Sequence, residues 1–332
     1  MLTSLGRAAG AAVVMVILSA CDLPFGLGLP TIRALNSGAG DSLDAARSFR
    51  IAGTYTESAT AWKMDLELVR PNTQHVLFSA QDINLEAIIT DGGSYFRGQQ
   101  FLASHMGTDP YSRSLVQAAG DSWWTGLPAA TSNSTLTDFT KGSGLRSTFL
   151  GTAVTSRTDH VSTGGVPAIE LSGPRADVFL SDVPPYRVLR VRMKGGAVVD
   201  GISAADFVYG DFDRDFAIAA PAGALNFADL STLPPVYTVV SVDTTGCAFP
   251  CVVSAALKNL GGRSGSPAPS TVKFTMTDAQ TNTVLGACQV TVQPDVGHSA
   301  TTTVSCTIAG VNGFDQNAAV VTAAADNPGV AG

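Results

Sequence analysis

The sequence has few charged and few reactive side chains. Lys, Arg, Asp and Glu make up only 14% of the 332 residues, and the formal net charge is −7. Four histidines are present, and they are scattered along the chain without the pairwise spacing of a zinc site: His75, His105, His160 and His298. An acidic chain without a basic stretch excludes nucleic acid as a partner, because phosphate binding needs a positive surface.

Signatures of catalysis are also missing. The chain has no Gly-x-Ser-x-Gly elbow, Walker loop or dinucleotide-binding glycine motif between a strand and a helix. The run Asp211–Asp215 places three carboxylates at alternate positions, but the glycine and the distal Glu of an EF-hand are absent, so a solvated face is favoured over calcium. We therefore expect no enzyme, no cofactor and no metal site.

Long apolar runs are absent too, and the one short run ends on a cysteine. Arg7 precedes an apolar stretch, 8–20, that is shorter than the ~20 residues of a membrane-spanning helix and has the order of a secretory signal peptide. The four residues Leu18 to Cys21 resemble the bacterial lipobox, whose cysteine is diacylated. The resemblance implies a signal peptide over 1–20 and anchorage of an extracytoplasmic lipoprotein, at the cell membrane or outer envelope, through acylated Cys21. An ordinary cleaved signal is the alternative.

The remaining four cysteines lie in the last hundred or so residues, and an even number in an exported chain indicates disulfides. Cys247 and Cys251 are spaced for a local staple. Cys288 and Cys306 lie on predicted successive strands, and pairing across that hairpin would close a loop worth ~3 kcal/mol. Cross-pairing between the two sets stays open.

The segment after Cys21 is rich in Gly, Pro and Ser, which predicts a flexible tether over 21–40. Ser42 is a candidate N-cap for a short helix, Leu43 to Ser48.

Residues 49–89 alternate between apolar and polar side chains. This period of two, with turn residues between the runs, predicts an antiparallel sheet that has one apolar and one wet face. A fifth strand is expected to begin at Tyr95. The apolar face must be covered, and we assign the cover to a helix, Pro110–Ala119, capped by Asp109 and ended by Gly120.

A second apolar-periodic piece spans 136–149, and further strands follow it. We expect these strands at 166–171, 176–180, 186–193, 205–212 and 216–219.

The last part of the chain differs in composition. It is rich in Thr, Val and Ala, with turn residues every 10–18 positions, which predicts a small β-sandwich over 236–326. The segment Ala256–Gly262 resembles a strand end of bacterial immunoglobulin-like adhesion modules. Six strands are expected, at 237–242, 252–257, 271–276, 284–291, 301–308 and 318–324.

The order of helix, sheet strands, helical excursion and further strands behind a lipobox resembles that of LolA/LppX-like bacterial lipoproteins. Three local stretches carry the resemblance: Ser48–Tyr55, Asp91–Gly98 and Gly120–Trp124 followed by Leu127-Pro128. The resemblance implies a curved antiparallel half-barrel over 41–229, joined to the sandwich by a linker at 230–235.

The predicted fold class is therefore mainly β with some helix (α+β): a curved antiparallel half-barrel sheet with covering helices, then a small β-sandwich. Known members of the resembled family carry lipid-linked molecules, which implies a cavity for a lipid or other apolar ligand. Its candidate lining residues are Met64, Leu66, Leu68, Phe78, Ile83, Leu85, Ile89, Leu115 and Val116.

Two functional hypotheses remain open. In the first, an acyl chain fills an incompletely covered apolar face. In the second, the half-barrel is filled by its own side chains, and the protein binds an envelope protein or a surface polymer through its C-terminal module.

Overall fold

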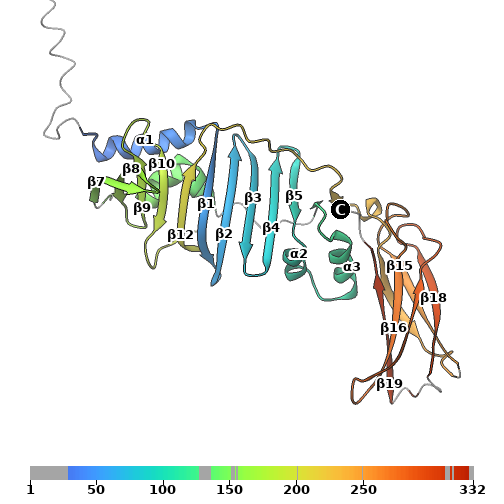
Figure 1. The fold of residues 1–332 in the computed structure, drawn as a ribbon. Helices are drawn as coiled ribbons and strands as arrows, with labels where there is room; N and C mark the ends of the chain where they lie inside the picture. Colours follow the sequence, from blue (N-terminus) through green and yellow to red (C-terminus); the bar gives the residue numbers. More distant parts are fainter. Residues whose placement is uncertain are drawn as a thin grey trace, which may run out of the picture. The chain divides into compact units, whose positions relative to one another are not determined.

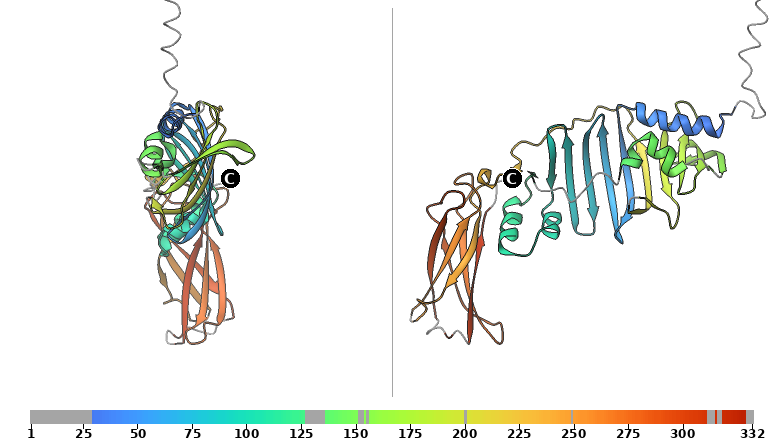
Figure 2. Two further views of the ribbon diagram at one scale, coloured as in Figure 1. Left: turned by 90° about the vertical axis from the view of Figure 1, so that its left-hand side faces the viewer. Right: turned by 180° about the vertical axis from the view of Figure 1, so that it is seen from behind.

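The computed structural model describes residues 29–126, 136–150, 154, 156–199, 201–248, 250–310, 315 and 318–328. The architecture is mainly β, as predicted (Figures 1 and 2). Thirteen of the described strands belong to one sheet, and six form two sheets of three strands each. No helix among the described residues is both long enough and apolar enough to cross a membrane.

The chain divides into two compact units, which we describe separately. The first comprises Met1–Ala46 with Thr135–Asp206, and the second comprises Arg47–Ser134 with Phe207–Gly332. The domain limits expected from the sequence stay predictions.

The first unit combines short helices with strands in the order β12-β10-β9-β8-β7, which pair antiparallel from β10 to β7; β11 lies antiparallel beside β12. Its elements are α1 (Ile32–Ala45), α4 (Thr137–Thr140), α5 (Gly142–Gly144), the π-helix η2 (Leu145–Leu150), β7 (Ser156–Thr163), β8 (Val166–Ser172), β9 (Ala176–Ser181), β10 (Val188–Met193), β11 (Val198–Val199) and the first part of β12 (Ile202–Gly210).

Helix α1 corrects two expectations. It begins at Ile32, so residues 32–40 are helical rather than a flexible tether, and the helix ends three residues before Ser48. The Thr31 hydroxyl caps it by accepting a hydrogen bond from the Ala34 amide at 3.2 Å. Leu35, Ala39 and Leu43 lie four residues apart on one face and are fully buried. This apolar stripe stabilises a helix in a segment whose Gly and Ser content suggested a linker.

The second unit carries the strands that follow α1. Its larger sheet runs in the order β13-β6-β5-β4-β3-β2-β1, antiparallel except that β13 pairs with β6 in parallel, so the sheet is mixed rather than wholly antiparallel. Its elements are β1 (Ser48–Glu57), β2 (Thr60–Val69), β3 (Thr73–Ala80), β4 (Ile83–Thr90), β5 (Gly93–Arg97), α2 (Gln99–His105), α3 (Pro110–Ala119), β6 (Trp124–Thr125), β13 (Leu225–Asn226) and the 3-10 helix η3 (Leu230–Thr232).

Helix α3 has the limits predicted from the sequence. An Asp109 carboxylate oxygen accepts a hydrogen bond from the Ser112 amide at 3.0 Å, and the helix ends at Gly120, whose φ is +48°. Helix α2 was not predicted. Its residues Phe101 and Leu102 pack with Leu115 of α3 in one apolar cluster, which also includes Leu85 of β4.

The other side of α3 contacts the C-terminal sandwich, which belongs to the same unit. The Ser114 hydroxyl donates to the Tyr237 carbonyl oxygen at 3.1 Å. Ala118 packs with Val236 and Leu260 in a small buried cluster. Helix α3 is therefore shared between the apolar cluster under the sheet and the sandwich.

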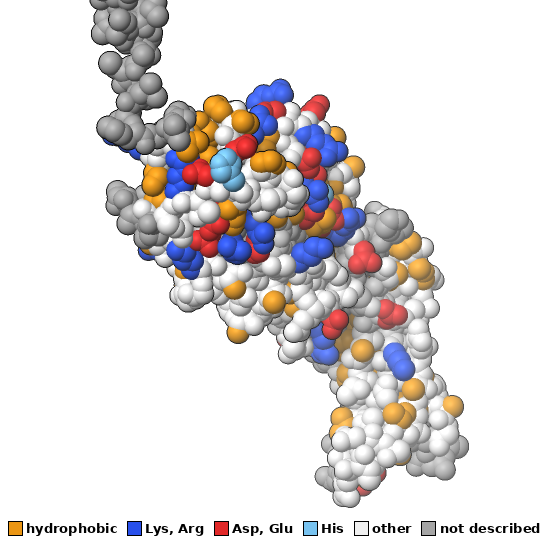
Figure 3. Space-filling view, turned by 60° about the vertical axis from the view of Figure 1, so that its left-hand side comes forward, with side chains coloured by type: hydrophobic (Ala, Val, Ile, Leu, Met, Phe, Trp, Pro, Cys, Tyr) orange, Lys and Arg blue, Asp and Glu red, His pale blue; other side chains and the backbone are white. Residues whose placement is uncertain are grey.

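All six strands of the sandwich lie where the sequence predicts them. They form two antiparallel sheets, β14-β15-β18 and β17-β16-β19, around a common core that includes Phe274, Val253 and Leu257. The strands are β14 (Tyr237–Asp243), β15 (Cys251–Asn259), β16 (Thr271–Asp278), β17 (Val284–Thr291), β18 (Thr301–Ile308) and β19 (Ala319–Asp326). Residues 236–326 contain only three Lys or Arg and five Asp. Figure 3 shows a correspondingly sparse distribution of coloured charges over this sandwich.

Two other strand predictions need correction. The expected strand at 216–219 is absent, because the Ile218 amide donates to the Phe216 carbonyl within the segment, at 3.0 Å, instead of to a neighbouring strand. Strand β7 was not predicted, because its sequence, SRTDHVST, is polar at nearly every position and shows no alternation of apolar and polar residues.

Candidate functional site

The predicted lipid attachment site cannot be placed in the fold. Cys21 and the predicted signal peptide, 1–20, lie outside the described residues, as does the first part of the expected tether, 21–28. Lipid anchorage stays a prediction.

The nine apolar residues proposed as a cavity lining are mostly buried by protein. Met64 is 0% exposed and Leu85 is 3% exposed. Leu66, Leu68 and Leu115 are also buried, whereas the other four are half-buried: Phe78, Ile83, Ile89 and Val116. Five of the nine lie together in the apolar cluster under the sheet, namely Phe78, Ile83, Leu85, Leu115 and Val116. We call the sheet face that carries Met64 and Leu85 the inner face.

A cavity of about 650 Å³ lies at β2 to β5 and extends to the start of α2. Its lining includes the cross-strand row Met64–Phe78–Leu85 together with the two rows that flank it. Since successive residues of a strand point to opposite faces, the flanking rows project from the face opposite Met64, which we call the outer face.

Two observations place this cavity on the outer face. Both outer rows line it in full, whereas the next inner row, Leu66–Val76–Ala87, does not contribute. Met64 and Leu85 also have almost no exposed surface, so they contribute a floor rather than walls. We name this cavity the outer groove. Its volume falls within the ~300–1,000 Å³ of small-molecule and cofactor sites.

One wall of the groove lies towards the β1–β2 and β3–β4 turns, and its only charged residue is Lys63, at the β2 end. It consists of Lys63 on β2, Ser79 on β3 and Asn84 on β4, which are register partners. Gly98 follows β5 and lets the chain pass close to this wall: a Cβ at that position would lie 2.3 Å from the Asn84 carbonyl oxygen, and its φ is +150°. The groove thus requires glycine at this point.

The other wall is the row Asp65–Leu77–Glu86–Arg97. Its carboxylates are held by neighbouring cations. The Arg50 guanidinium donates from Nε to Asp65 Oδ1 at 2.6 Å and from Nη2 to Asp65 Oδ2. This hydrogen bonding raises the pKa of Arg50 above its ordinary value, and burial opposes the rise.

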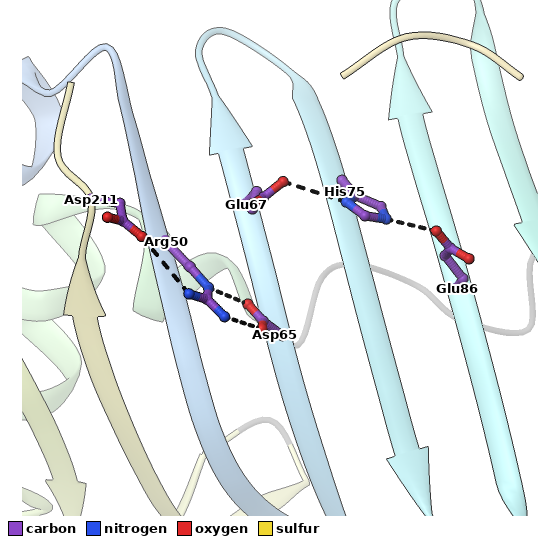
Figure 4. Close-up of polar contacts among 6 residues, drawn as sticks. All are labelled: Arg50, Asp65, Glu67, His75, Glu86 and Asp211. Carbon is purple, nitrogen blue, oxygen red and sulfur yellow. Dashed lines mark hydrogen bonds and ion pairs between the residues drawn. The ribbon is translucent and has the colours of Figure 1, made fainter. Parts of the chain in front are cut away.

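Glu86 lies between two partners. His75 Nε2 is 2.8 Å from Glu86 Oε1, while Nδ1 of the same ring is 3.4 Å from Glu67 Oε2 (Figure 4). Arg97 donates from Nε to Glu86 Oε2 at 2.9 Å, and its guanidinium carbon lies 4.9 Å from the Trp123 ring centroid. The outer face is therefore a network of paired charges across β1 to β5, with Leu77 as an apolar side chain that is 45% exposed.

The acidic run 211–215 takes part in this ionic network. Asp211 lies 3.8 Å from Arg50 Nη1 and 3.5 Å from Arg214 Nη1, and Asp213 accepts a hydrogen bond from the Arg47 amide at 3.0 Å. Within the described ranges, no group of three His, Cys, Asp or Glu side chains is arranged to hold a metal ion.

The four C-terminal cysteines form two disulfides, Cys247–Cys251 and Cys288–Cys306. The first is the predicted local staple. The second has the predicted partners but does not cross a hairpin, because β17 and β18 belong to different sheets. It joins the two sheets of the sandwich.

The sequence analysis did not identify the outer groove. Alternation alone assigned Lys63, Asp65 and Glu67 to a wet face. The available signal was Leu77, an apolar residue at a position where the neighbouring residues on the wet face are polar.

Comparisons with known proteins do not assign the chain to a family. No protein-family model and no curated protein sequence matches the chain. Among solved structures, it is similar to the crystal structure of MucB in complex with MucA(peri), with 11% identity over 89% of this chain and 92% of that chain and a TM-score of 0.26. A TM-score this low describes a distant likeness, from which no ligand or partner follows.

Proposed function

We propose that the chain is a non-catalytic binding protein of the bacterial cell envelope, anchored through acylated Cys21, that binds a partner protein in the outer groove. The observation that carries this proposal is the contrast between the two faces of the sheet. The inner face supplies buried apolar side chains, and the outer face supplies an open cavity of about 650 Å³ with polar walls and an exposed leucine.

An extracytoplasmic location is supported by the disulfides. Both join residues of the sandwich, and disulfides persist in oxidising compartments rather than in the cytosol. The proposed membrane anchor is the acylated Cys21, and it rests on the resemblance of Leu18 to Cys21 to a lipobox.

The proposal has no chemical step. Among the described residues, the titratable groups that line the groove either form ion pairs with neighbouring side chains or stand at its two ends, which suits recognition by charge and hydrogen bonds.

The test is selection of ligands by the full chain in detergent micelles from a random heptapeptide display library. Selected peptides should lose binding to a Ser79→Trp variant, which fills the groove. They should keep binding to Thr73→Trp, a matched variant on the same face and strand that does not line the groove. Ligands that bind both variants equally, or a failure to select any ligand, would overturn the proposal.

A second candidate function is carriage of a lipid or other apolar ligand on the inner face. It is favoured by the half-buried Phe78, Ile83 and Val116 at the margin of the apolar cluster. Native mass spectrometry of the full chain, followed by organic extraction, tests it: a stoichiometric lipid beyond the anchor acyl chains, lost in Phe78→Gln, would support carriage. An unliganded mass after incubation with lipid would exclude it.

A further inference from the structure

The outer groove runs across the strands rather than along them. Its walls are the rows that start at Lys63 and Asp65 on β2 and continue over β3, β4 and β5. Three strand spacings of about 4.8 Å give a length of roughly 14 Å. An extended polypeptide rises about 3.4 Å per residue, so five residues span the groove, with side chains i, i+2 and i+4 facing its floor.

The two ends of the groove carry opposite charges. Lys63 lies at the β2 end. Asp121 lies at the other end, in the turn before β6, which pairs with β5. In the part of the chain that the structure describes, neither side chain has an ion-pair partner, whereas Asp65 is paired with Arg50 and Glu86 with Arg97. The charges that remain available to a ligand are therefore one cation and one anion, at opposite ends of the groove.

The middle of the groove combines an apolar and a hydrogen-bonding surface. Leu77 is 45% exposed and is the apolar member of the row Asp65–Leu77–Glu86–Arg97, so it offers a ligand an apolar contact. Ser79, Asn84 and Gln100 line the groove as well, and their hydroxyl and amide groups can both donate and accept hydrogen bonds. An extended peptide presents backbone N–H and C=O groups that need such partners. An acyl chain would leave these groups unpaired.

We propose that the outer groove binds an extended polypeptide segment with an acidic, an apolar and a basic side chain at alternate positions. The acidic side chain pairs with Lys63, the apolar side chain packs on Leu77, and the basic side chain pairs with Asp121. This inference rests on the proposed function, since it specifies the partner segment that the groove accepts.

The test is a set of fluorescein-labelled peptides with blocked ends, titrated against the full chain at low ionic strength. The probe SETLTKS carries the three side chains at alternate positions. Its companions SKTLTKS and SETLTES carry two like charges, and SETSTKS lacks the apolar residue. The wild-type chain should bind SETLTKS about three- to tenfold more tightly than each companion, because exposed ion pairs contribute modestly.

Charge reversal should change the preference rather than remove binding. Lys63→Glu should prefer SKTLTKS, and Asp121→Lys should prefer SETLTES, by similar factors. Because both variants gain a ligand, a loss of folding cannot imitate the result. Lys273→Glu and Asp91→Lys are matched reversals at exposed positions that do not line the groove, and they should keep the wild-type preference.

The other outcomes separate this inference from the function on which it rests. Peptide affinities that ignore both reversals would overturn the inference, as would groove-dependent ligands from the display library that lack the alternate charged pattern; the groove would then be a binding site of another specificity. If Ser79→Trp affects no ligand at all, the proposed function falls together with the inference.

Discussion

Replacement of Asn259 by Ala should unfold the C-terminal sandwich locally. This side chain is fully buried at the end of β15. Its oxygen accepts from the Val236 and Gly261 amides at 3.0 Å each. Its amide nitrogen donates to two carbonyl oxygens, each at 2.7 Å, those of Gly262 and Val296.

The size of the effect follows from these four hydrogen bonds. A buried hydrogen bond contributes about 0.5–1.5 kcal/mol net, and a partner left unpaired in the interior costs about as much or more. Four bonds lost at once correspond to about 4 kcal/mol. Water cannot replace the amide fully, because the site has no exposed surface.

The assay is hydrogen exchange of the full chain, followed by mass spectrometry of peptides from β14 and β15. Exchange measures local opening, which suits a chain with two compact units better than a single unfolding curve does. About 4 kcal/mol corresponds to roughly a thousandfold loss of protection for these amides. Gln280→Ala, at an exposed turn position, serves as the control and should change protection little.

The reasoning would be refuted if Asn259→Ala lowered protection by less than about tenfold. Asn259→Asp gives a second measure: it keeps an acceptor oxygen but places a carboxylate beside two carbonyl oxygens, so its loss should be at least half as large.

Three further outcomes follow from the same structure. Removal of the Cys288–Cys306 disulfide by paired Cys→Ser changes should lower the free energy of unfolding by about 3 kcal/mol, and removal of Cys247–Cys251 should lower it by about 2 kcal/mol. The difference arises because the closed loops span 18 and 4 residues. Calorimetry of both variants tests this order. Gly98→Ala should lower the free energy of unfolding by about 1–3 kcal/mol, because the new Cβ would clash with a carbonyl oxygen of β4. Gly92→Ala is the control: the atom nearest to its new Cβ would be 3.6 Å away, so the midpoint of thermal unfolding should change little. The pKa of Asp109 is lowered by hydrogen bonds from Ser112, so its stabilisation is present above the ordinary carboxyl pKa and is lost as the pH falls through the folded value. Asp109→Asn should therefore reduce the fall of the unfolding midpoint as the pH is lowered below about 4.

The sequence predicted those helices and strands whose ends are marked by residues within or next to the element itself. Helix α3 was predicted because Asp109, Pro110 and Gly120 mark its ends, and the sandwich strands were predicted because turn residues separate clear runs. Helix α1 was misjudged because its burial depends on three residues spread over two turns, which the surrounding Gly and Ser concealed.

The candidate site depends on register, which no single strand reveals. Alternation assigned Lys63 and Leu77 to strands but could not show that their rows flank a common floor, because that requires the pairing of β2 with β3 and of β3 with β4. Likewise, the partners of Cys288 and Cys306 could be inferred from number and spacing. Their position on two different sheets could not be inferred, because it depends on how six strands are ordered.

The double contact of α3 has a consequence for excision of the sandwich. Deleting residues 236–332 would expose Ala118 to water and remove the acceptor of the Ser114 hydroxyl, while Leu115 would remain in the apolar cluster under the sheet. The helix would lose one of its two supports, so the truncated protein would have a weakened inner layer as well as one module fewer. A force or ligand that acts on β14 therefore also acts on the ten-residue helix α3, which packs against the apolar cluster under the sheet.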